Sequence, residues 1–183
     1  MKNILLLLLT IPILCVSQDL PQVDGKVVYS IDVYNDNSDK MEMYSKCKSF
    51  ISDVLKPENV ILHTENFESG QIIGKGVSAF SNYAKKGFTW ASGAATRPTF
   101  TLQFDVYDNK VTFTIKEIVL AKLNVMDEVL RPIEYDMTLE KRKIQSLKEG
   151  RLKDRRLKRY QENADMINDH FYSLLVLFKK HVE

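Results

Sequence analysis

The first stretch with a chemically suggestive spacing is glycine-rich and runs from Gly70 to Gly76 as GQIIGKG. A phosphate-binding P-loop places four residues between its glycines and a serine or threonine after its lysine. Here three residues separate Gly70 from Gly74, and Gly76 follows the lysine. A loose dinucleotide fingerprint also fits, but it needs a following helix and an acidic residue about 20 positions later, where this chain has Thr96. We therefore predict a positive-φ turn at Gly70 and close packing or a bulge at the other two glycines.

Other reactive residue types occur without their companion motifs. Ser45 and Lys48 have the SxxK spacing in which lysine can activate a serine, but the SDN and KTG motifs are missing. The histidines, His63, His170 and His181, form no HxxxH or HExxH motif, so no metal-ligand set with a known spacing is present. We assign no catalytic, cofactor-binding or metal-binding residue. The sequence leaves enzymatic activity open and favours its absence.

The largest charge anomaly lies between Lys141 and Arg159, where ten Lys or Arg residues accompany Glu149 and Asp154. The whole chain has a formal charge of only +2. Such a block is typical of a dock for an anionic partner, such as lipid head groups, lipopolysaccharide phosphates, an acidic glycan or an acidic protein. The alternative is a solvated helix face that pairs with acidic residues of the same chain. Nucleic acid is disfavoured, because the chain is expected to be exported and no aromatic residue is interleaved with the cations before Tyr160.

A tryptophan in a Gly- and Ala-rich loop is a second candidate contact, because an exposed tryptophan is a natural binding anchor. The alternative is a ring folded back onto the sheet edge. The predicted partner surface consists of Trp90, Lys148, Arg151, Arg155, Arg156 and Arg159.

The N-terminal segment has the features of a secretory signal peptide. Lys2 precedes an apolar run that extends to Leu14, and Cys15 and Ser17 then place small residues at positions −3 and −1 of a cleavage site after Ser17. Lipoprotein processing at Cys15 is the weaker alternative, because a large leucine precedes that cysteine. We therefore expect an exported protein, periplasmic or secreted. Cys47 would be its only thiol, and we expect that thiol to be buried.

The rest of the chain must supply the elements that position these residues. Hydrophobic residues make up 44% of the chain, enough for a core, yet no apolar run reaches the ~18–20 residues of a transmembrane helix. A helix capped by Ser38 or Asp39 should end at Pro57, with an apolar stripe that includes Val54 and Leu55. Period-two alternation predicts strands at Lys26–Tyr34, Val60–Glu65, Gln71–Tyr83, Thr99–Tyr107 and Lys110–Ile118.

The last third of the chain changes character. An irregular crossing around Pro132 precedes a basic helical segment from Leu139 onward. A second helix from Leu157 to Val182 carries apolar residues at spacings of three and four. We predict that this helix returns onto the sheet. The expected organisation is a signal peptide at 1–17, an α+β domain at 18–122 and a basic helical C-terminal extension at 123–183.

Several of these segments together resemble a known family. They are the strand at Val27–Tyr29, the helix with Tyr44, the ESGQIIGKG stretch at Glu68–Gly76 and the FTLQFDVYDNKVTFTI hairpin at Phe100–Ile115. Their order resembles exported Bacteroidetes proteins described as a domain of unknown function with a TBP-like fold, over roughly Gly25–Val119. The resemblance implies a curved antiparallel sheet with a helix on one face, and it implies no activity, cofactor or catalytic residue. Fold similarity to a DNA-binding protein does not imply DNA binding.

These observations predict an α+β protein with a curved antiparallel sheet of about four to five strands, a helix on one face and a helical C-terminal extension. The favoured function is a non-enzymatic binding or assembly module of the cell envelope, with the open sheet face and the basic extension as contact surfaces. One alternative is an envelope hydrolase whose residues converge only in the fold. Another is an accessory subunit whose last helix packs on a second chain.

Overall fold

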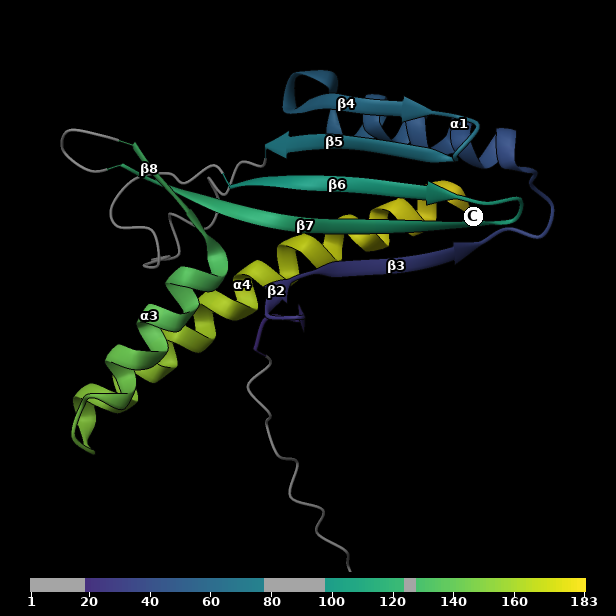
Figure 1. Cartoon of the computed structure of the whole chain (residues 1–183). Helices are drawn as coiled ribbons and strands as arrows, with labels where there is room; N and C mark the ends of the chain where they lie inside the picture. Colours follow the sequence, from purple (N-terminus) through teal and green to yellow (C-terminus); the bar gives the residue numbers. More distant parts are fainter. Residues whose placement is uncertain (1–18, 78–97, 124–127) are drawn as a thin grey trace, which may run out of the picture.

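A computed structural model describes residues 19–77, 98–123 and 128–183 of the chain (Figure 1). The strands are β1 (Gln22–Val23), β2 (Lys26–Val27), β3 (Tyr29–Tyr34), β4 (Val60–Asn66), β5 (Gln71–Val77), β6 (Thr99–Val106), β7 (Lys110–Leu123) and β8 (Glu128–Pro132). The α-helices are α1 (Lys40–Phe50), α3 (Ile133–Gln145) and α4 (Arg151–Val182). A π-helical turn (Ile51–Leu55) and a 3₁₀ turn (Pro57–Asn59) follow α1. None of these described helices, α4 included, combines the length and apolar character needed to cross a bilayer.

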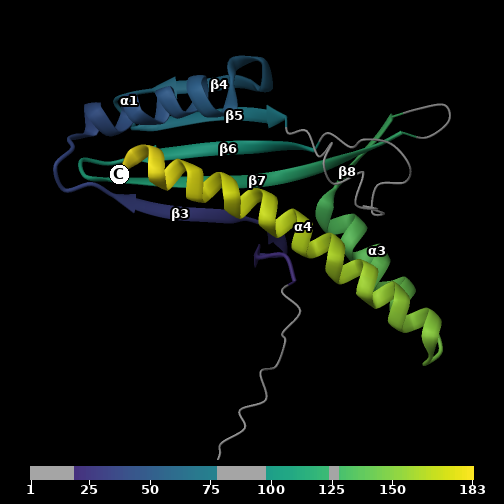
Figure 2. The same ribbon diagram turned by 180° about the vertical axis from the view of Figure 1, so that it is seen from behind.

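The main sheet is antiparallel and has the strand order β3-β7-β6-β5-β4, with β8 also paired to β7. Both α1 and α4 lie on one face of this sheet (Figures 1 and 2). The predicted α+β class is confirmed. The sheet has six strands rather than four to five, because β7 extends to Leu123 and the segment before Ile133, predicted to be irregular, forms β8.

Two bulges bend the strands. In β7 the register shifts opposite Thr99–Thr101, and Glu117 there adopts a positive φ of 53°. The Thr101 hydroxyl donates to the Glu117 carboxylate at 2.6 Å, which holds this unusual conformation in place. In β4 the register shifts between Leu62 and Thr64. Because a bulge increases local twist, both features contribute to a curved sheet.

Four fully buried phenylalanine rings form the centre of the core. They are Phe50 of α1, Phe104 of β6, Phe113 of β7 and Phe178 of α4. The ring centroid of Phe178 lies 5.1 Å from that of Phe50, 5.2 Å from Phe104 and 4.9 Å from Phe113. Rings at these separations add a favourable pairing energy to their burial. Phe178 therefore connects both helices to the sheet.

The predicted stripe on the last helix is confirmed along most of its length, and the helix returns onto the sheet. Its buried members are Tyr160, Ala164, Ile167, Phe171, Leu175 and Phe178. Leu157 was predicted to belong to this stripe, but its side chain is 41% exposed. The helix also starts earlier than predicted, at Arg151. Its first turns have left the sheet and lie beside α3, so the sheet does not cover Leu157 (Figure 2).

The C-terminal end of α4 is fixed by two donors from the other end of the chain. The Asn35 amide and the Lys46 ammonium donate to the Val182 carbonyl oxygen at 3.1 Å and 3.0 Å. They satisfy an acceptor at a position where helices lack internal partners.

Helix α1 begins as predicted, because the Asp39 carboxylate accepts a hydrogen bond from the Glu42 amide at 2.8 Å. The thiol of Cys47 is completely buried, as expected, and desolvation raises its pKa to about 12. The predicted stripe is wrong at Val54, which is 36% exposed. The π-helical turn that starts at Ile51 explains this, because its wider repeat rotates the following side chains away from the helical spacing.

The predicted roles of the glycines are confirmed. Gly70 has a φ of 70°, and its carbonyl accepts a hydrogen bond from the Val106 amide at 2.7 Å. A Cβ atom at Gly76 would lie 2.6 Å from the Phe100 ring, and one at Gly74 would lie 3.0 Å from the Ile61 carbonyl oxygen. The stretch thus allows neighbouring strands and side chains to pack closely.

Gly70→Ala should destabilise the protein more than Gly25→Ala. Both glycines have φ values near +70°, so each substitution incurs a left-handed strain of about 1–2 kcal/mol. At Gly70 the new Cβ would also lie 2.1 Å from the Val106 carbonyl oxygen, whereas at Gly25 it would meet nothing within 4 Å. Urea denaturation followed by circular dichroism should show an additional loss of roughly 1 kcal/mol or more for Gly70→Ala. Equal losses would contradict the steric argument.

Candidate functional site

Helices α3 and α4 form an antiparallel hairpin that projects beyond one end of the sheet (Figure 1). Residues 146–150 connect the two helices at its tip. The buried residues Ile133, Met137 and Ile144 of α3 recur at spacings of four and seven, as expected for one packed face of a helix. The hairpin carries the whole basic segment that the sequence identified.

The carboxylate of Asp19 ties the start of the described chain to both helices of the hairpin. Its Oδ1 accepts a hydrogen bond from the Tyr160 hydroxyl at 2.6 Å, and its Oδ2 forms an ion pair with Lys141. The Lys141 ammonium also lies 5.7 Å from the centroid of the Tyr160 ring. Desolvation raises the pKa of Asp19, but the hydrogen bonds from Lys141 and Tyr160 outweigh it, so the net pKa is lowered.

Glu140 of α3 forms a second connection between the helices. It accepts from Arg156 of α4 at 3.2 Å and from Lys143 of its own helix at 2.8 Å. Desolvation raises the pKa of Glu140, and these two donors more than compensate and lower it. Glu140 is therefore an ionised carboxylate whose charge is matched within the hairpin.

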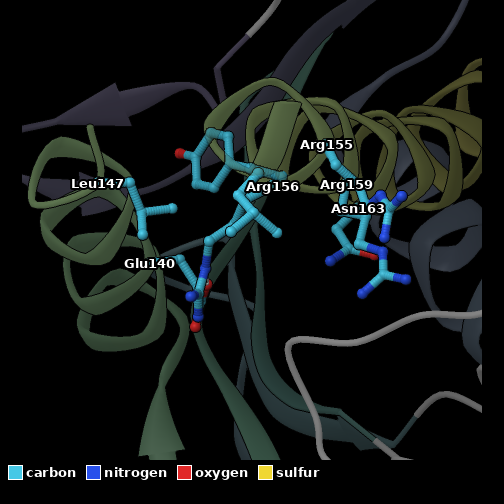
Figure 3. Close-up of a pocket in the computed structure, with 8 residues that line it drawn as sticks. Glu140, Leu147, Arg155, Arg156, Arg159 and Asn163 are labelled. Carbon is cyan, nitrogen blue, oxygen red and sulfur yellow. Dashed lines mark hydrogen bonds and ion pairs between the residues drawn. The ribbon is translucent and has the colours of Figure 1, made fainter. Parts of the chain in front are cut away.

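A groove of about 450 Å³ runs between the two helices. Its lining consists of Glu140, Leu147, Leu152, Arg155, Arg156, Arg159, Tyr160 and Asn163. Arg155, Arg159 and Asn163 follow one another at intervals of four residues, and Figure 3 shows their side chains grouped on one side of the groove. Arg156 points instead toward Glu140. The groove thus combines a pair of arginines with an apolar wall.

Half of the cations in the basic segment have acidic partners. The pairs are Lys141–Asp19, Lys143–Glu140, Lys153–Glu149, Arg156–Glu140 and Lys158–Glu162. The other five side chains are exposed and form no ion pair with any residue that the structure describes; they are Arg142, Lys148, Arg151, Arg155 and Arg159. The basic segment therefore combines cations that pair with acidic residues of the same chain and cations that form no such pair within the described ranges.

The structure separates the residues of the predicted partner surface. Arg155, Arg156 and Arg159 line the groove, whereas Lys148 and Arg151 lie at the tip of the hairpin. Trp90 lies outside the described residues. Sequence reasoning missed the apolar lining, Leu147 and Leu152. Leu152 could have been found from its spacing of three, four and seven residues to the three arginines, which places it on their face of the helix.

The open face of the sheet, opposite α1 and α4, is polar and largely satisfied by its own contacts. Thr112 donates to Asp32 at 2.7 Å, Gln71 donates to Asp105 at 3.1 Å, and Lys116 donates to Gln103 at 2.7 Å. These bonds run between neighbouring strands and bring together residues distant in sequence. The face offers hydrogen-bonding groups to a partner.

One serine–histidine pair was not anticipated from the sequence. The Ser49 hydroxyl lies 2.8 Å from Nε2 of His181, which joins α1 to the end of α4. The same hydroxyl also donates to the Lys46 carbonyl at 3.0 Å, and the donor in its pair with His181 depends on the tautomer of the ring. A serine nucleophile needs a histidine that accepts its proton, whereas here that proton has the Lys46 carbonyl as an acceptor. This geometry fits a structural contact between the helices.

The predicted SxxK motif also lacks a base. Lys48 forms an ion pair with Glu65 of β4 at 2.7 Å. The hydrogen bond and the charge of Glu65 raise the pKa of Lys48, whereas a general base needs a lowered one. Across residues 19–77, 98–123 and 128–183, no three His, Cys, Asp or Glu side chains cluster in a way that could hold a metal ion.

Asp19→Asn should lower the free energy of unfolding by roughly 1 kcal/mol at neutral pH, because it weakens a half-exposed charged contact with Lys141 and Tyr160. Because the folded-state pKa of Asp19 is depressed, its stabilisation is present above the unfolded pKa and is lost as the pH falls through the folded value. In urea titrations, the difference in unfolding free energy between Asp19→Asn and the wild type should therefore become smaller below about pH 4. Asp165→Asn, at an exposed position of α4, is the control for loss of a surface carboxylate. A difference that persists unchanged in acid would contradict a charge-based role.

Two solved structures share this fold. A TBP-like protein from Parabacteroides distasonis ATCC 8503 matches with 16% identity and a TM-score of 0.55, over 87% of this chain and 96% of that chain. A DUF4468 family protein from Bacteroides ovatus ATCC 8483 matches with 16% identity and a TM-score of 0.56, over 87% of this chain and 90% of that chain. Each alignment covers 87% of this chain, which is more than residues 1–120 could supply. Both alignments therefore extend into the C-terminal part of the chain, beyond position 120. At this identity the likeness shows the fold alone.

No protein with a curated description matches the chain. A family model described as a domain of unknown function (DUF4468) with TBP-like fold matches residues 29–120, which is half of the chain. The matched region contains the ESGQIIGKG stretch and the β6–β7 hairpin on which the sequence resemblance rested. The chain therefore belongs to the DUF4468 family, whose domain has a TBP-like fold and an unknown function.

Proposed function

We propose that this protein is an exported, non-enzymatic binding or assembly module of the cell envelope, and that its α3–α4 hairpin contacts an anionic partner. The observation that carries the proposal is the group of five exposed cations on the hairpin without an ion pair in the described part of the chain. They lie on an element that projects from the sheet, where a large partner can reach them (Figure 2).

The arrangement of these cations supports binding rather than folding. Arg155 and Arg159 are like charges at a spacing of four on one helix, which costs a few tenths of a kcal/mol in stability. Other cations of the segment hold the hairpin together through Asp19 and Glu140. Arg155 and Arg159 form no such ion pair within residues 19–77, 98–123 and 128–183, and an anionic partner would remove their mutual repulsion. Trp90 stays a predicted member of the partner surface.

Export rests on the N-terminal sequence pattern. A signal peptide cleaved after Ser17 would leave Gln18 as the first residue of the mature protein, directly before the anchored Asp19. Intact-mass spectrometry of the protein expressed in a bacterial host with its full leader should give a chain that starts at Gln18. A lipid-modified chain that starts at Cys15 would show the alternative processing, and an unprocessed chain would overturn export.

The binding role can be tested with charge-matched variants. We expect Arg151→Gln/Arg155→Gln/Arg159→Gln to lose most of the envelope material that the immobilised wild-type protein retains, because two groove cations and one tip cation are removed. The control Lys26→Gln/Lys75→Gln/Lys180→Gln removes the same charge from exposed positions that belong neither to the groove nor to the tip, and it should behave as the wild type. Added salt should weaken wild-type retention, since exposed charges are screened. Equal retention by both folded variants would overturn the proposal.

A further inference from the structure

Two of the three arginines that line the groove, Arg155 and Arg159, have an arrangement that suits a phosphate group. Arg155 and Arg159 are one helical turn apart, so their Cβ atoms are about 5–6 Å from each other. Both side chains are exposed and neither has an acidic partner among the described residues, and Figure 3 shows them on the same side of the groove. A guanidinium group donates through a planar fork that matches phosphate oxygens. One phosphate between the two forks would neutralise the pair.

The rest of the groove suits an apolar group. Leu152 is 70% exposed, and Leu147 and the Tyr160 ring contribute further apolar surface to the lining. The carboxylate of Glu140 also lines the groove, but Arg156 and Lys143 match its charge, so it does not repel an anion strongly. A volume of about 450 Å³ exceeds what a phosphate ion alone would fill and lies within the range of small-molecule sites.

The tip of the hairpin adds two features of a membrane contact. Lys148 and Arg151 precede Leu152 at the end that lies farthest from the sheet, and both are exposed without an ion pair within the described ranges. Each cation close to an anionic bilayer adds about 1 kcal/mol of attraction. An exposed leucine among cations at the end of a helix can enter the head-group region.

We infer that the groove between α3 and α4 binds an anionic lipid, with the lipid phosphate between Arg155 and Arg159 and the hydrocarbon part against Leu152 and Leu147. This inference rests on the proposed function, because it names the chemistry of the anionic partner. The positive charge of the two arginines favours a phosphate group. The exposed Leu152 favours a lipid, which has an apolar part, over a free phosphate ion. An acidic protein would match the cations but would leave the apolar wall unexplained.

Vesicle co-sedimentation tests the inference with the purified protein. We expect binding to phosphatidylcholine vesicles that contain phosphatidylglycerol and none to vesicles of phosphatidylcholine alone. Arg155→Gln/Arg159→Gln should weaken binding about tenfold or more. Leu152→Ser should also weaken vesicle binding, yet leave binding of inorganic phosphate, followed by calorimetry, unchanged. The control Lys75→Gln/Lys180→Gln removes two exposed charges elsewhere and should bind vesicles as the wild type does; circular dichroism confirms that each variant is folded.

The remaining outcomes separate this inference from the proposed function. Binding of inorganic phosphate through the two arginines without binding to vesicles would overturn the lipid assignment and identify a free-phosphate site. Binding of poly-glutamate through the same arginines, with neither vesicles nor phosphate bound, would overturn the lipid inference and support an acidic protein partner, so the proposed function would survive. Absence of binding to all three probes would overturn both.

Discussion

The contact between Phe178 and the rings of Phe50, Phe104 and Phe113 is the constraint on which the rest of the structure depends. Burial of a phenylalanine side chain contributes about 1.5–3 kcal/mol, and each of these rings comes from a different element. The cluster places the C-terminal half of α4 across the sheet beside α1. The other half of the same helix leaves the sheet and pairs with α3. The aromatic cluster, which is distant from the charged residues, thus determines the position of the α3–α4 hairpin.

The hairpin uses its cations in two ways. Lys141 and Arg156 bridge to acidic residues and hold the two helices and the start of the chain together. Arg155 and Arg159 belong to the same charge block but form no ion pair with the residues that the structure describes. A count of charges along the sequence treats all of these residues alike. Their division into structural and available cations arises from contacts such as Lys141–Asp19, whose partners are 122 positions apart.

Features encoded by local patterns could be predicted from the sequence. The Asp39 cap, the turn at Gly70, the β6–β7 hairpin and the stripe around Phe178 all follow from spacings within a few residues. The strand β8 was missed because its pairing with β7 gives no alternating pattern next to Pro132. The start of α4 was placed too late because its first turns are charged and carry little apolar periodicity. With a helix start at Leu157, Leu152 lies outside the predicted helix and is not recognised as a neighbour of the arginines, although the cations themselves are identified.

The continuity of α4 has a mechanical consequence. At 1.5 Å per residue, its 32 residues form a rod about 48 Å long. One end is clamped at Val182 by Asn35 and Lys46, and Tyr160 is held by Asp19 farther along. Because α4 runs without interruption from the sheet to the tip, a change in the angle of the α3–α4 hairpin would require this helix to bend or the aromatic cluster to separate. The fold therefore sets the orientation of a partner bound at the hairpin tip and its distance from the sheet.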